Sequence, residues 1–362
     1  MKALEIKSKL FIVVTLLLTL CSCKGQQEER EVTLPADSEK KSEQQKSKIT
    51  DNKQPLFYPG FDGQMSQVIR TMFQDSEGNL WFGTQNGAFK FEDNTLIHID
   101  GITSETMDDV TIKDITQSKD GKIWLAHTDG VSSIDGNTIT NYSESNGLLN
   151  NDVWSVVADR TGKIWIATID GVCVFNGEEF IEFYLPEGKI DTTVGFSSKK
   201  MVHNIFEDSK GTLWFSSNAG LFSYANDTLM NISQQRGIPT NFVNEVFEDT
   251  KGGLWVSTKA GLYNLTENNT VHITEEKIEN GKGIGNIAED KDGKIWFVSN
   301  QHYLYTYDGE HLKEIEKSEE NERPVIFKIF KDKDDRLWFV GYGGAFRWED
   351  GKFISVTKNG PW

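Results

Sequence analysis

The sequence predicts an all-β protein: a single seven-bladed β-propeller with four antiparallel strands in each blade. The main observation is an internal repeat, because a Leu-Trp or Ile-Trp dipeptide recurs seven times at intervals of 41 to 49 residues. Repeats of about 40–45 residues that hold four strands are typical of propeller blades. Composition agrees, since 32 glycines against 7 prolines, with 10 Trp, 22 Phe and 9 Tyr, suit strands joined by tight turns.

Each repeat carries the same turn and strand signals. Asp stands six residues before the Trp, except for Ser118 in the second repeat, and Gly stands three before it, except for Asp335 in the seventh. Asp accepts backbone N–H bonds at a turn and Gly adopts a positive φ, so this segment favours a tight hairpin. We expect a first strand such as 243–249, a second strand that contains the Trp, a third that starts at a later Gly, and a short fourth such as 270–273. The repeats are centred on Trp81, Trp124, Trp165, Trp214, Trp255, Trp296 and Trp338.

The repeated tryptophans are expected to pack between blades. Burying one Trp removes about 200 Å² from water, which contributes on the order of 5 kcal/mol. Trp154, Trp348 and Trp362 fall outside the repeat and are therefore free for other roles. The seven repeats fill residues 68–356 in one strand order, so no blade is expected to be split between the two ends of the chain. Residues 54–60 or the tail 357–362 are the candidates for bracing the closure.

The N-terminus predicts an export signal. Three lysines precede an apolar run at 10–20, and Leu20-Cys21-Ser22-Cys23 resembles a bacterial lipobox, in which the chain is cleaved before a cysteine that then carries lipid. We expect a lipoprotein signal peptide at 1–22, the lipidated Cys23 with a polar, disordered tether at 23–55, and the propeller at 56–362. A plain secretory signal and a transmembrane anchor are the alternatives. The expected location is the outer membrane or cell envelope, with the periplasmic and surface faces both open.

Charge and motifs exclude several functions. With 38 Lys+Arg against 55 Asp+Glu, the net charge of −17 repels the phosphate backbone, so no nucleic-acid partner is expected. P-loop, GxSxG, HExxH and paired CxxC motifs are missing from the sequence, and no cofactor is expected. Segments 290–293 and 332–335 superficially resemble calcium loops but align with the turns of the other repeats, so no metal site is expected. Cys173 would remain the only other cysteine of the mature chain and is expected to be a buried apolar residue.

Two stretches resemble a known family. Segments 147–171 (GLLNNDVWSVVAD…GKIWIATIDG) and 78–87 (GNLWFGTQNG) look like the two-component regulator propeller repeat. The resemblance covers 66–357 and implies a sensor propeller of the kind found in hybrid two-component systems of Bacteroidota that sense oligosaccharides. Those sensors carry two propellers, a transmembrane helix and a histidine kinase. This chain shows one propeller and no second apolar span after residue 23, so binding is the property that the resemblance implies for it.

Two sequence columns are expected to line the mouth of the central channel, where the first strand of each blade begins. Residues eleven and ten positions before each Trp vary in chemistry, as expected of a ligand funnel. Trp154 would stack on a sugar ring, while polar neighbours bind hydroxyls or a carboxylate. Alternatively, these residues satisfy one another. The insert 185–200 is expected at the same mouth, or else as an unstructured excursion. The candidate ligand-binding residues are Arg70, Lys113, His127, Trp154, His203, Asn204, Asn244 and Glu245.

His127 interrupts a column of Thr and Ser and raises a catalytic hypothesis. Propeller lyases use a His and a carboxylate to abstract a proton, and His127, His203 and Glu245 would provide such a set. However, His127 and His203 belong to repeats two and four, which are not adjacent, and no residue is assigned as catalytic. The function expected first is an envelope-anchored binding or sensory propeller for a glycan or other small molecule, without its own kinase. A protein-interaction scaffold within an envelope complex and a lyase are the alternatives.

Overall fold

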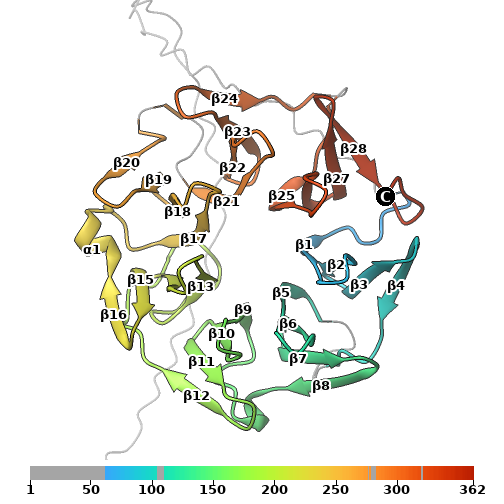
Figure 1. The fold of residues 1–362 in the computed structure, drawn as a ribbon, viewed down its shortest axis with the longest axis horizontal. Coiled ribbons are helices and arrows are strands. Elements are labelled where there is room, and N and C mark those ends of the chain that lie inside the picture. Colours follow the sequence, from blue (N-terminus) through green and yellow to red (C-terminus); the bar gives the residue numbers. More distant parts are fainter. Residues whose placement is uncertain (1–61, 104–109, 276, 279–282, 319–320) are drawn as a thin grey trace, which may run out of the picture. The chain divides into compact units, whose positions relative to one another are not determined.

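The computed structural model describes residues 62–362, apart from 104–109, 276, 279–282 and 319–320. These residues form seven four-stranded antiparallel sheets around a central axis (Figure 1). Each blade is continuous in sequence, and its strands pair in chain order, so the predicted seven-bladed propeller is confirmed. The predicted signal peptide 1–22, Cys23, the tether 23–55 and the segment 54–60 lie outside the described residues.

The strands follow the repeat. Blade 1 holds β1 (Ile69–Gln74), β2 (Leu80–Thr84), β3 (Gly87–Glu92) and β4 (Thr95–Ile99); blade 2 holds β5 (Ile112–Gln117), β6 (Ile123–His127), β7 (Gly130–Asp135) and β8 (Thr138–Tyr142). Blade 3 holds β9 (Val153–Ala158), β10 (Ile164–Thr168), β11 (Gly171–Phe175) and β12 (Phe180–Phe183); blade 4 holds β13 (Val202–Glu207), β14 (Leu213–Ser217), β15 (Gly220–Ala225) and β16 (Thr228–Asn231). Blade 5 holds β17 (Val243–Glu248), β18 (Leu254–Thr258), β19 (Gly261–Leu265) and β20 (Thr270–His272); blade 6 holds β21 (Ile284–Glu289), β22 (Ile295–Ser299), β23 (Tyr303–Tyr307) and β24 (Leu312–Ile315). Blade 7 holds β25 (Val325–Lys331), β26 (Leu337–Tyr342), β27 (Gly344–Glu349) and β28 (Lys352–Val356), and two short helices, η1 (Glu144–Asn146) and α1 (Ile232–Arg236), lie in connections.

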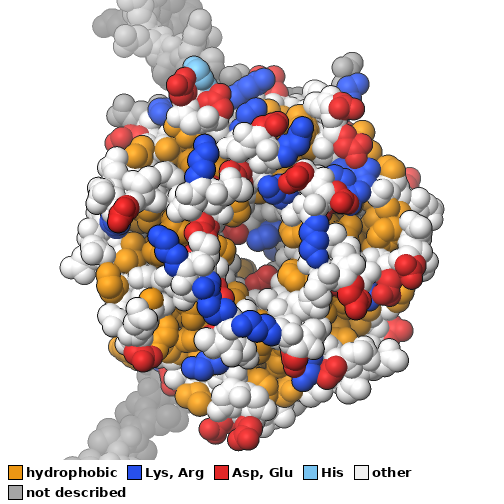
Figure 2. Space-filling model, in the orientation of Figure 1, with side chains coloured by type: hydrophobic (Ala, Val, Ile, Leu, Met, Phe, Trp, Pro, Cys, Tyr) orange, Lys and Arg blue, Asp and Glu red, His pale blue; other side chains and the backbone are white. Residues whose placement is uncertain are grey.

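The first strand of each blade faces the central channel. Neighbouring first strands contact one another around the whole ring, in the order β1, β5, β9, β13, β17, β21, β25 and back to β1. Seen from the side drawn in Figure 1, the surface is hollowed at its centre, with basic and acidic side chains interleaved around the opening (Figure 2).

The turn between the first two strands is built on the repeated Asp. In blade 4, Asp208 Oδ1 accepts hydrogen bonds from the backbone N–H of Lys210 (2.9 Å) and Thr212 (2.8 Å), and Oδ2 accepts one from Trp214 Nε1 (2.9 Å). Gly211 has a φ of 86°, as the turn requires. Asp290 in blade 6 makes the same three bonds, so this acidic segment is a turn and the calcium resemblance is superficial.

The repeated Trp packs against the next blade. Trp165 of blade 3, for example, belongs to a core cluster with Val202, Ile205 and Phe215 of blade 4. The same arrangement recurs at each junction, including Trp338 of blade 7 against blade 1. The prediction that this column packs between blades is confirmed. One carboxylate therefore shapes a turn and also satisfies the indole N–H of a buried ring.

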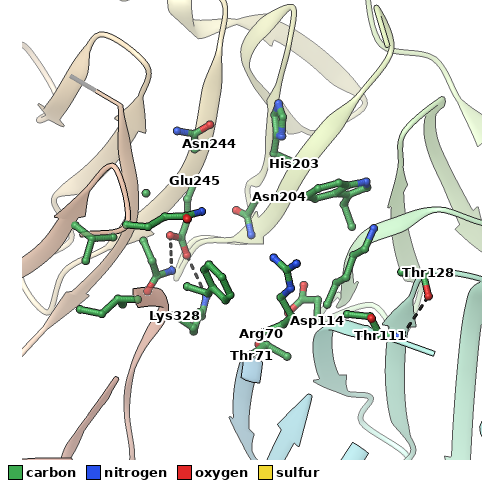
Figure 3. Close-up of a pocket in the computed structure, with 18 of the residues that line it drawn as sticks. Arg70, Thr71, Thr111, Asp114, Thr128, His203, Asn204, Asn244, Glu245 and Lys328 are labelled. Carbon is green, nitrogen blue, oxygen red and sulfur yellow. Dashed lines mark hydrogen bonds and ion pairs between the residues drawn. The ribbon is translucent and has the colours of Figure 1, made fainter. Parts of the chain in front are cut away.

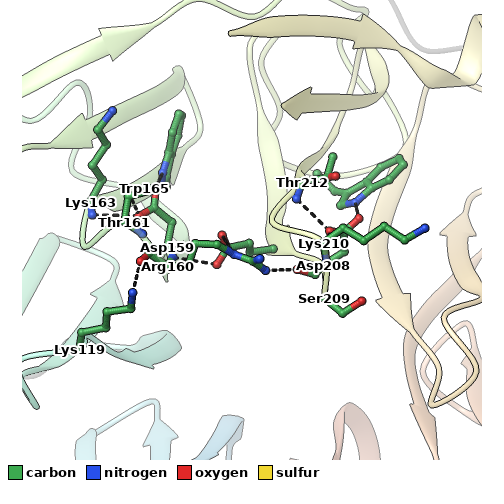
Figure 4. A network of polar contacts seen from close by, with 12 residues as sticks. Lys119, Asp159, Arg160, Thr161, Lys163, Trp165, Asp208, Ser209, Lys210 and Thr212 are labelled. Carbon is green, nitrogen blue, oxygen red and sulfur yellow. Dashed lines mark hydrogen bonds and ion pairs between the residues drawn. The ribbon is translucent and has the colours of Figure 1, made fainter. Parts of the chain in front are cut away.

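A second set of bonds joins the turns of neighbouring blades at five of the seven junctions. The residue after the turn Asp donates its backbone N–H to the side chain that ends the first strand of the next blade (Figure 4). Arg160 N, for instance, donates to Glu207 Oε2 (3.0 Å), while its guanidinium bonds Glu207 Oε1 (2.9 Å) and Asp208 O (2.7 Å). The other links of this kind are Ser76 to Gln117, Ser209 to Glu248, Thr250 to Glu289 and Lys333 to Gln74.

Both chain segments that flank the propeller brace the junction of blades 7 and 1. Gln64 Nε2 donates to Ser355 Oγ (2.9 Å), and Lys358 N donates to the carbonyl of Gly63 (2.8 Å). Trp362 stacks on Phe91, with ring centroids 4.1 Å apart. The tail 357–362 is therefore a closure brace, and Trp362 is committed to it.

Trp348 is also committed to packing, because its ring meets Trp296 edge-on at 5.2 Å. In blade 6, His302 stands where the other blades have the glycine, and the two residues before it, Asn300 and Gln301, adopt positive φ (48° and 63°). In the described part of the chain, no helix is long and apolar enough to cross a membrane.

Blade 2 lacks the Asp–Trp bond. Ser118 replaces the turn Asp and bonds Asp120 Oδ1 (2.5 Å) and the carbonyl of Lys122 (3.2 Å) instead. The buried Trp124 Nε1 consequently has no hydrogen-bond partner within the described ranges. Blade 6 has the turn sequence Asp-Lys-Asp-Gly-Lys-Ile-Trp at 290–296, and blade 2 differs from it only by its first residue.

Substituting Ser118→Asp should stabilise the protein, because it gives Trp124 the acceptor that the same turn supplies in blade 6. A hydrogen bond to a charged group contributes about 1.5–3 kcal/mol, and thermal unfolding should show a Tm higher by several degrees. The mirror-image control is Asp290→Ser, which should lower the Tm. An unchanged or lower Tm for Ser118→Asp would contradict this account of the turn.

Candidate functional site

A cavity of about 570 Å³ opens at the mouth of the central channel. Residues from all seven blades line it (Figure 3). Seven of the eight candidate residues lie in its wall, and His127 does not. The seven are Arg70, Lys113, Trp154, His203, Asn204, Asn244 and Glu245.

A β-bulge in every first strand turns these side chains toward the channel. In blade 1, Ile69 pairs with Thr84 and Thr71 with Gly83, which leaves Arg70 as the extra residue. The register shifts at the same place in the other six blades. Because a bulge breaks the strict alternation of a strand, two consecutive residues of each first strand can face the cavity. We call the extra residues the bulge column and the residues after them the belt column. The bulge column is Arg70, Lys113, Trp154, His203, Asn244, Gly285 and Phe327, and the belt column is Thr71, Asp114, Ser155, Asn204, Glu245, Asn286 and Lys328.

The belt column mostly joins neighbouring blades. Asp114 Oδ2 accepts hydrogen bonds from Ser155 Oγ (2.7 Å) and Val156 N (3.1 Å). Ser155 Oγ in turn accepts the backbone N–H of Ile205 in blade 4 (3.2 Å). For these members the alternative that the residues satisfy one another is the better description.

On the other side of the channel, Glu245 Oε2 accepts from Asn286 Nδ2 (2.6 Å), and Asn286 Oδ1 accepts from Ile329 N (2.6 Å). Lys328 Nζ lies 3.1 Å from Glu245 Oε1. Desolvation alone would lower the pKa of Lys328, but the carboxylates of Glu245 and Asp114 raise it. Burial raises the pKa of Asp114.

The bulge column supplies an aromatic wall. The Lys113 ammonium forms an ion pair with Asp152 and lies 4.1 Å from the centre of the Trp154 ring. Burial lowers the pKa of Lys113, although Asp152 opposes that shift. Trp154 Nε1 donates to Asp152 Oδ2 (3.2 Å), and its ring lies 5.3 Å from that of Phe196. Lys113 and Asp152 therefore hold Trp154 in place at the rim.

The Arg70 guanidinium and the Asn204 amide are polar groups of the cavity without a hydrogen bond or ion pair in the described part of the chain. The Arg70 guanidinium lies 4.6 Å from the centre of the Phe327 ring and has no carboxylate within 4.0 Å in the described part of the chain. Desolvation by the cavity wall lowers the pKa of Arg70, although the side chain remains exposed at the mouth. Asn204 Oδ1 is buried without a hydrogen-bond partner. Both side chains point into the middle of the cavity (Figure 3).

The two remaining candidates, His203 and Asn244, each form one hydrogen bond within the protein. His203 Nε2 lies 2.8 Å from Asn218 Oδ1, and desolvation lowers the pKa of the imidazole, which favours its neutral form. Asn244 Nδ2 donates to the carbonyl of Ile284 (2.6 Å), which leaves its oxygen for other contacts.

The insert 185–200 folds over the mouth, as expected, and the unstructured alternative is wrong. Gly188 N donates to the carbonyl of Lys199 (2.8 Å), and Asn218 Nδ2 donates to the carbonyl of Ser198 (2.8 Å). Lys259 of blade 5 forms an ion pair with Asp191. Phe196 thereby reaches the cavity wall beside Trp154.

The structure does not bring His127 to the cavity. Its side chain is fully buried on β6, and Nε2 lies 2.9 Å from Ser132 Oγ of β7. Burial lowers the pKa of His127 to about 4, so the ring is neutral. In most other repeats a Thr or Ser stands at this position. Its hydroxyl bonds the turn before the third strand, as Thr84 Oγ1 donates to the carbonyl of Gly87 (2.9 Å). The hypothetical set of His127, His203 and Glu245 is therefore not assembled in this cavity.

Sequence reasoning missed Phe196, Asp152 and Gln301, which also line the cavity. Phe196 lies in an insert with no counterpart in other blades, so no column identifies it. Cys173 is buried, and burial raises its pKa to about 11, in keeping with the predicted apolar role. Across the described ranges, no group of three or more His, Cys, Asp or Glu side chains is placed to hold a metal ion.

Comparison with known proteins agrees with the repeat pattern. The family described as two component regulator propeller matches residues 63–86, 147–170 and 195–219. A search of curated proteins finds no match to the chain.

Several solved structures share the fold. The extracellular domain of BT3049, a proposed hybrid two component system from B. thetaiotaomicron, is 19% identical with a TM-score of 0.59 over 82% of this chain. This chain spans 40% of that domain. Virginiamycin B lyase from Staphylococcus aureus is 14% identical (TM-score 0.58; 77% of this chain and 93% of the lyase). YCF48 bound to D1 peptide is 11% identical (TM-score 0.59; 80% of this chain and 97% of that one).

At such identities the likeness to solved structures shows the fold alone. The family match adds the repeat, and it coincides with the turns and strands that the structure builds around the repeated Trp. The chain carries, on a seven-bladed propeller, the repeat of the two component regulator propeller family, whose model matches it in three segments.

Proposed function

We propose that this chain is an envelope-anchored binding or sensory module that recognises a glycan or another small molecule in the cavity at the channel mouth. The observation that carries the proposal is the pairing of an aromatic wall, Trp154 and Phe196, with the uncommitted polar groups Arg70 and Asn204. Aromatic faces pack on the apolar faces of sugar rings, and a few polar groups fix the orientation of the ligand.

The size and rigidity of the cavity support this function. Its volume of about 570 Å³ lies within the range of small-ligand sites. The belt column fixes the floor through side-chain bonds between blades, such as Asp114 to Val156 N. The ion pair of Lys113 and Asp152 holds Trp154 before any ligand arrives. A site formed in advance loses less conformational entropy on binding.

The family supports a sensory setting for the same site. The extracellular domain of BT3049, a proposed hybrid two component system, has a similar fold. We infer that ligand binding here serves recognition at the cell envelope and that any signal is passed to a separate protein partner. The lipobox at 20–23 supports anchoring through lipid on Cys23, in a bacterium of Bacteroidota type.

Substituting Trp154→Ala should weaken ligand binding about tenfold or more, because the largest flat apolar surface of the cavity is lost. The measurement is a thermal-shift screen of the propeller with neutral and acidic oligosaccharides, followed by calorimetry on each hit. Tyr184→Ala is the matched control, since that ring is 69% exposed and does not line the cavity. A hit that binds Trp154→Ala as tightly as the parent chain would place the ligand elsewhere.

Substituting Cys23→Ala should release the chain from the membrane fraction, because no thioether-linked lipid can form at that position. Labelling of cells with a palmitate analogue should mark the parent chain and leave the variant unlabelled. Cys173→Ala is the control and should keep both the label and the membrane location, since Cys173 is buried within the propeller. A labelled Cys23→Ala variant would contradict the proposed anchor.

A second candidate function, the protein-interaction scaffold, is favoured by one observation. Exposed large hydrophobic side chains gather on residues 181–196, where Ile181, Tyr184, Ile190, Val194 and Phe196 are 45–69% exposed. Exposed apolar side chains that lie together on a surface often mark contact with another protein. Trp348 and Trp362 do not contribute to such a surface, because both rings are packed in the propeller. A photo-cross-linker placed at Val194 should capture an envelope protein in the parent chain. The substitution Ile190→Asp should abolish that cross-link if this surface binds the partner.

A further inference from the structure

We propose that the ligand carries a single negative charge, a carboxylate or a sulfate ester, and that Arg70 and Asn204 bind this oxyanion. The inference rests on the proposed function and names the ligand class for the same cavity. Its starting point is the unequal use of the charged groups that line the wall.

The cavity wall holds three cations, Arg70, Lys113 and Lys328, and three carboxylates, Asp114, Asp152 and Glu245. Lys113 pairs with Asp152, and Lys328 pairs with Glu245 at 3.1 Å. Asp114 has its oxygens occupied, since it accepts from Ser155 Oγ, Val156 N and Ile115 N (3.0 Å). Arg70 is the remaining cation, and its N–H donors make no hydrogen bond in the described part of the chain.

The environment of Arg70 prepares it for an anion. The guanidinium is a rigid fork of five donors that matches two oxygens of one oxyanion. Phe327 lies 4.6 Å away and restrains the plane of the fork through its ring face. The surrounding walls lower the pKa of Arg70 by desolvation, and partly desolvated charges interact more strongly with a ligand charge than solvated ones do.

The second observation concerns Asn204 and does not depend on how the charged groups are paired. Its Oδ1 is buried without a partner, and its Nδ2 makes no hydrogen bond within the described ranges. The corresponding belt residues Asp114, Ser155, Glu245 and Asn286 all bond a backbone N–H of the next blade. Asn204 is thus a belt residue without the belt bond. Its amide points into the cavity together with Arg70 (Figure 3), where it would donate to the same oxyanion.

The acidic surroundings favour a monoanion over a dianion. Asp114, Asp152 and Glu245 all line the cavity, and one uncommitted guanidinium faces them. A phosphate monoester carries about −1.5 to −2 charges at neutral pH and would exceed that supply. The protein's own charge of −17 further disfavours highly charged polymers. Together with the aromatic wall at Trp154 and Phe196, these features fit a ring that bears one acid group, as in a uronic acid or a sulfated sugar.

Calorimetry with matched pairs of oligosaccharides tests the inference. The first pair is a trisaccharide that carries a single uronic acid and the methyl ester of that trisaccharide, and the second is a singly sulfated trisaccharide and its desulfated parent. We expect the acidic member of one pair to bind about tenfold or more tightly than its neutral match. Which pair shows the preference distinguishes carboxylate from sulfate. Arg70→Gln should abolish the preference, and Arg70→Lys should restore part of it.

Lys210→Gln is the control, because it removes the same charge from an exposed residue on a turn away from the cavity. It should keep the preference. Arg70→Gln should keep the parent Tm, since no ion pair of the fold is lost, so weaker binding would not reflect unfolding. Equal binding of acidic and neutral members, unaffected by Arg70→Gln, would overturn the oxyanion inference and leave the cavity as a site for neutral ligands. Failure of every member to bind would overturn the proposed function and this inference with it.

Discussion

The propeller depends on one repeated contact, the buried Trp whose indole N–H is bound by the Asp of its own turn. The carboxylate fixes the hairpin through backbone N–H groups, as Asp208 does, and it satisfies the one polar atom of a large ring. The ring is then available for packing against the next blade, where burial contributes several kcal/mol. Local turn formation and blade-to-blade cohesion are thereby coupled in a single residue pair. The unpaired Trp124 Nε1 in blade 2 shows that the ring of blades tolerates the loss of one such bond.

The same repetition separates structural from variable positions at the channel. A bulge in each first strand exposes two consecutive residues to the cavity. In four blades the belt residue accepts a backbone N–H of the next blade, so its chemistry there is constrained by the need for an acceptor, as at Ser155 and Asn286. The bulge residue is not paired in the ladder and is free to be Arg, Trp, His or Gly. Ligand specificity is therefore expected to reside mainly in the bulge column.

The sequence was sufficient to predict the blades because the Asp, Gly and Trp signals act locally and recur seven times. It also placed the two mouth columns, since a fixed distance from the Trp becomes a fixed height in the channel. It did not separate their roles, because a strand without a bulge would send Arg70 and Thr71 to opposite faces. His127 looked like a candidate only because it breaks a column; its hydrogen bond to Ser132 depends on the neighbouring strand. Phe196 lies in an insert, where no repeat supplies a reference position.

Arg70 and Asn204 differ from the other charged and amide side chains of the cavity because neither has a hydrogen-bond or ion-pair partner in the described part of the chain. Every other charged side chain in the wall has a partner or a full set of donors, and the other belt amide, Asn286, is bonded on both sides. A buried acceptor without a partner, such as Asn204 Oδ1, costs free energy. The fold remains stable because the burial of apolar side chains in the seven inter-blade clusters contributes much more free energy than this cost. Local conflict that persists in an otherwise consistent structure is expected at a functional site, and here both side chains point into one cavity beside its aromatic wall.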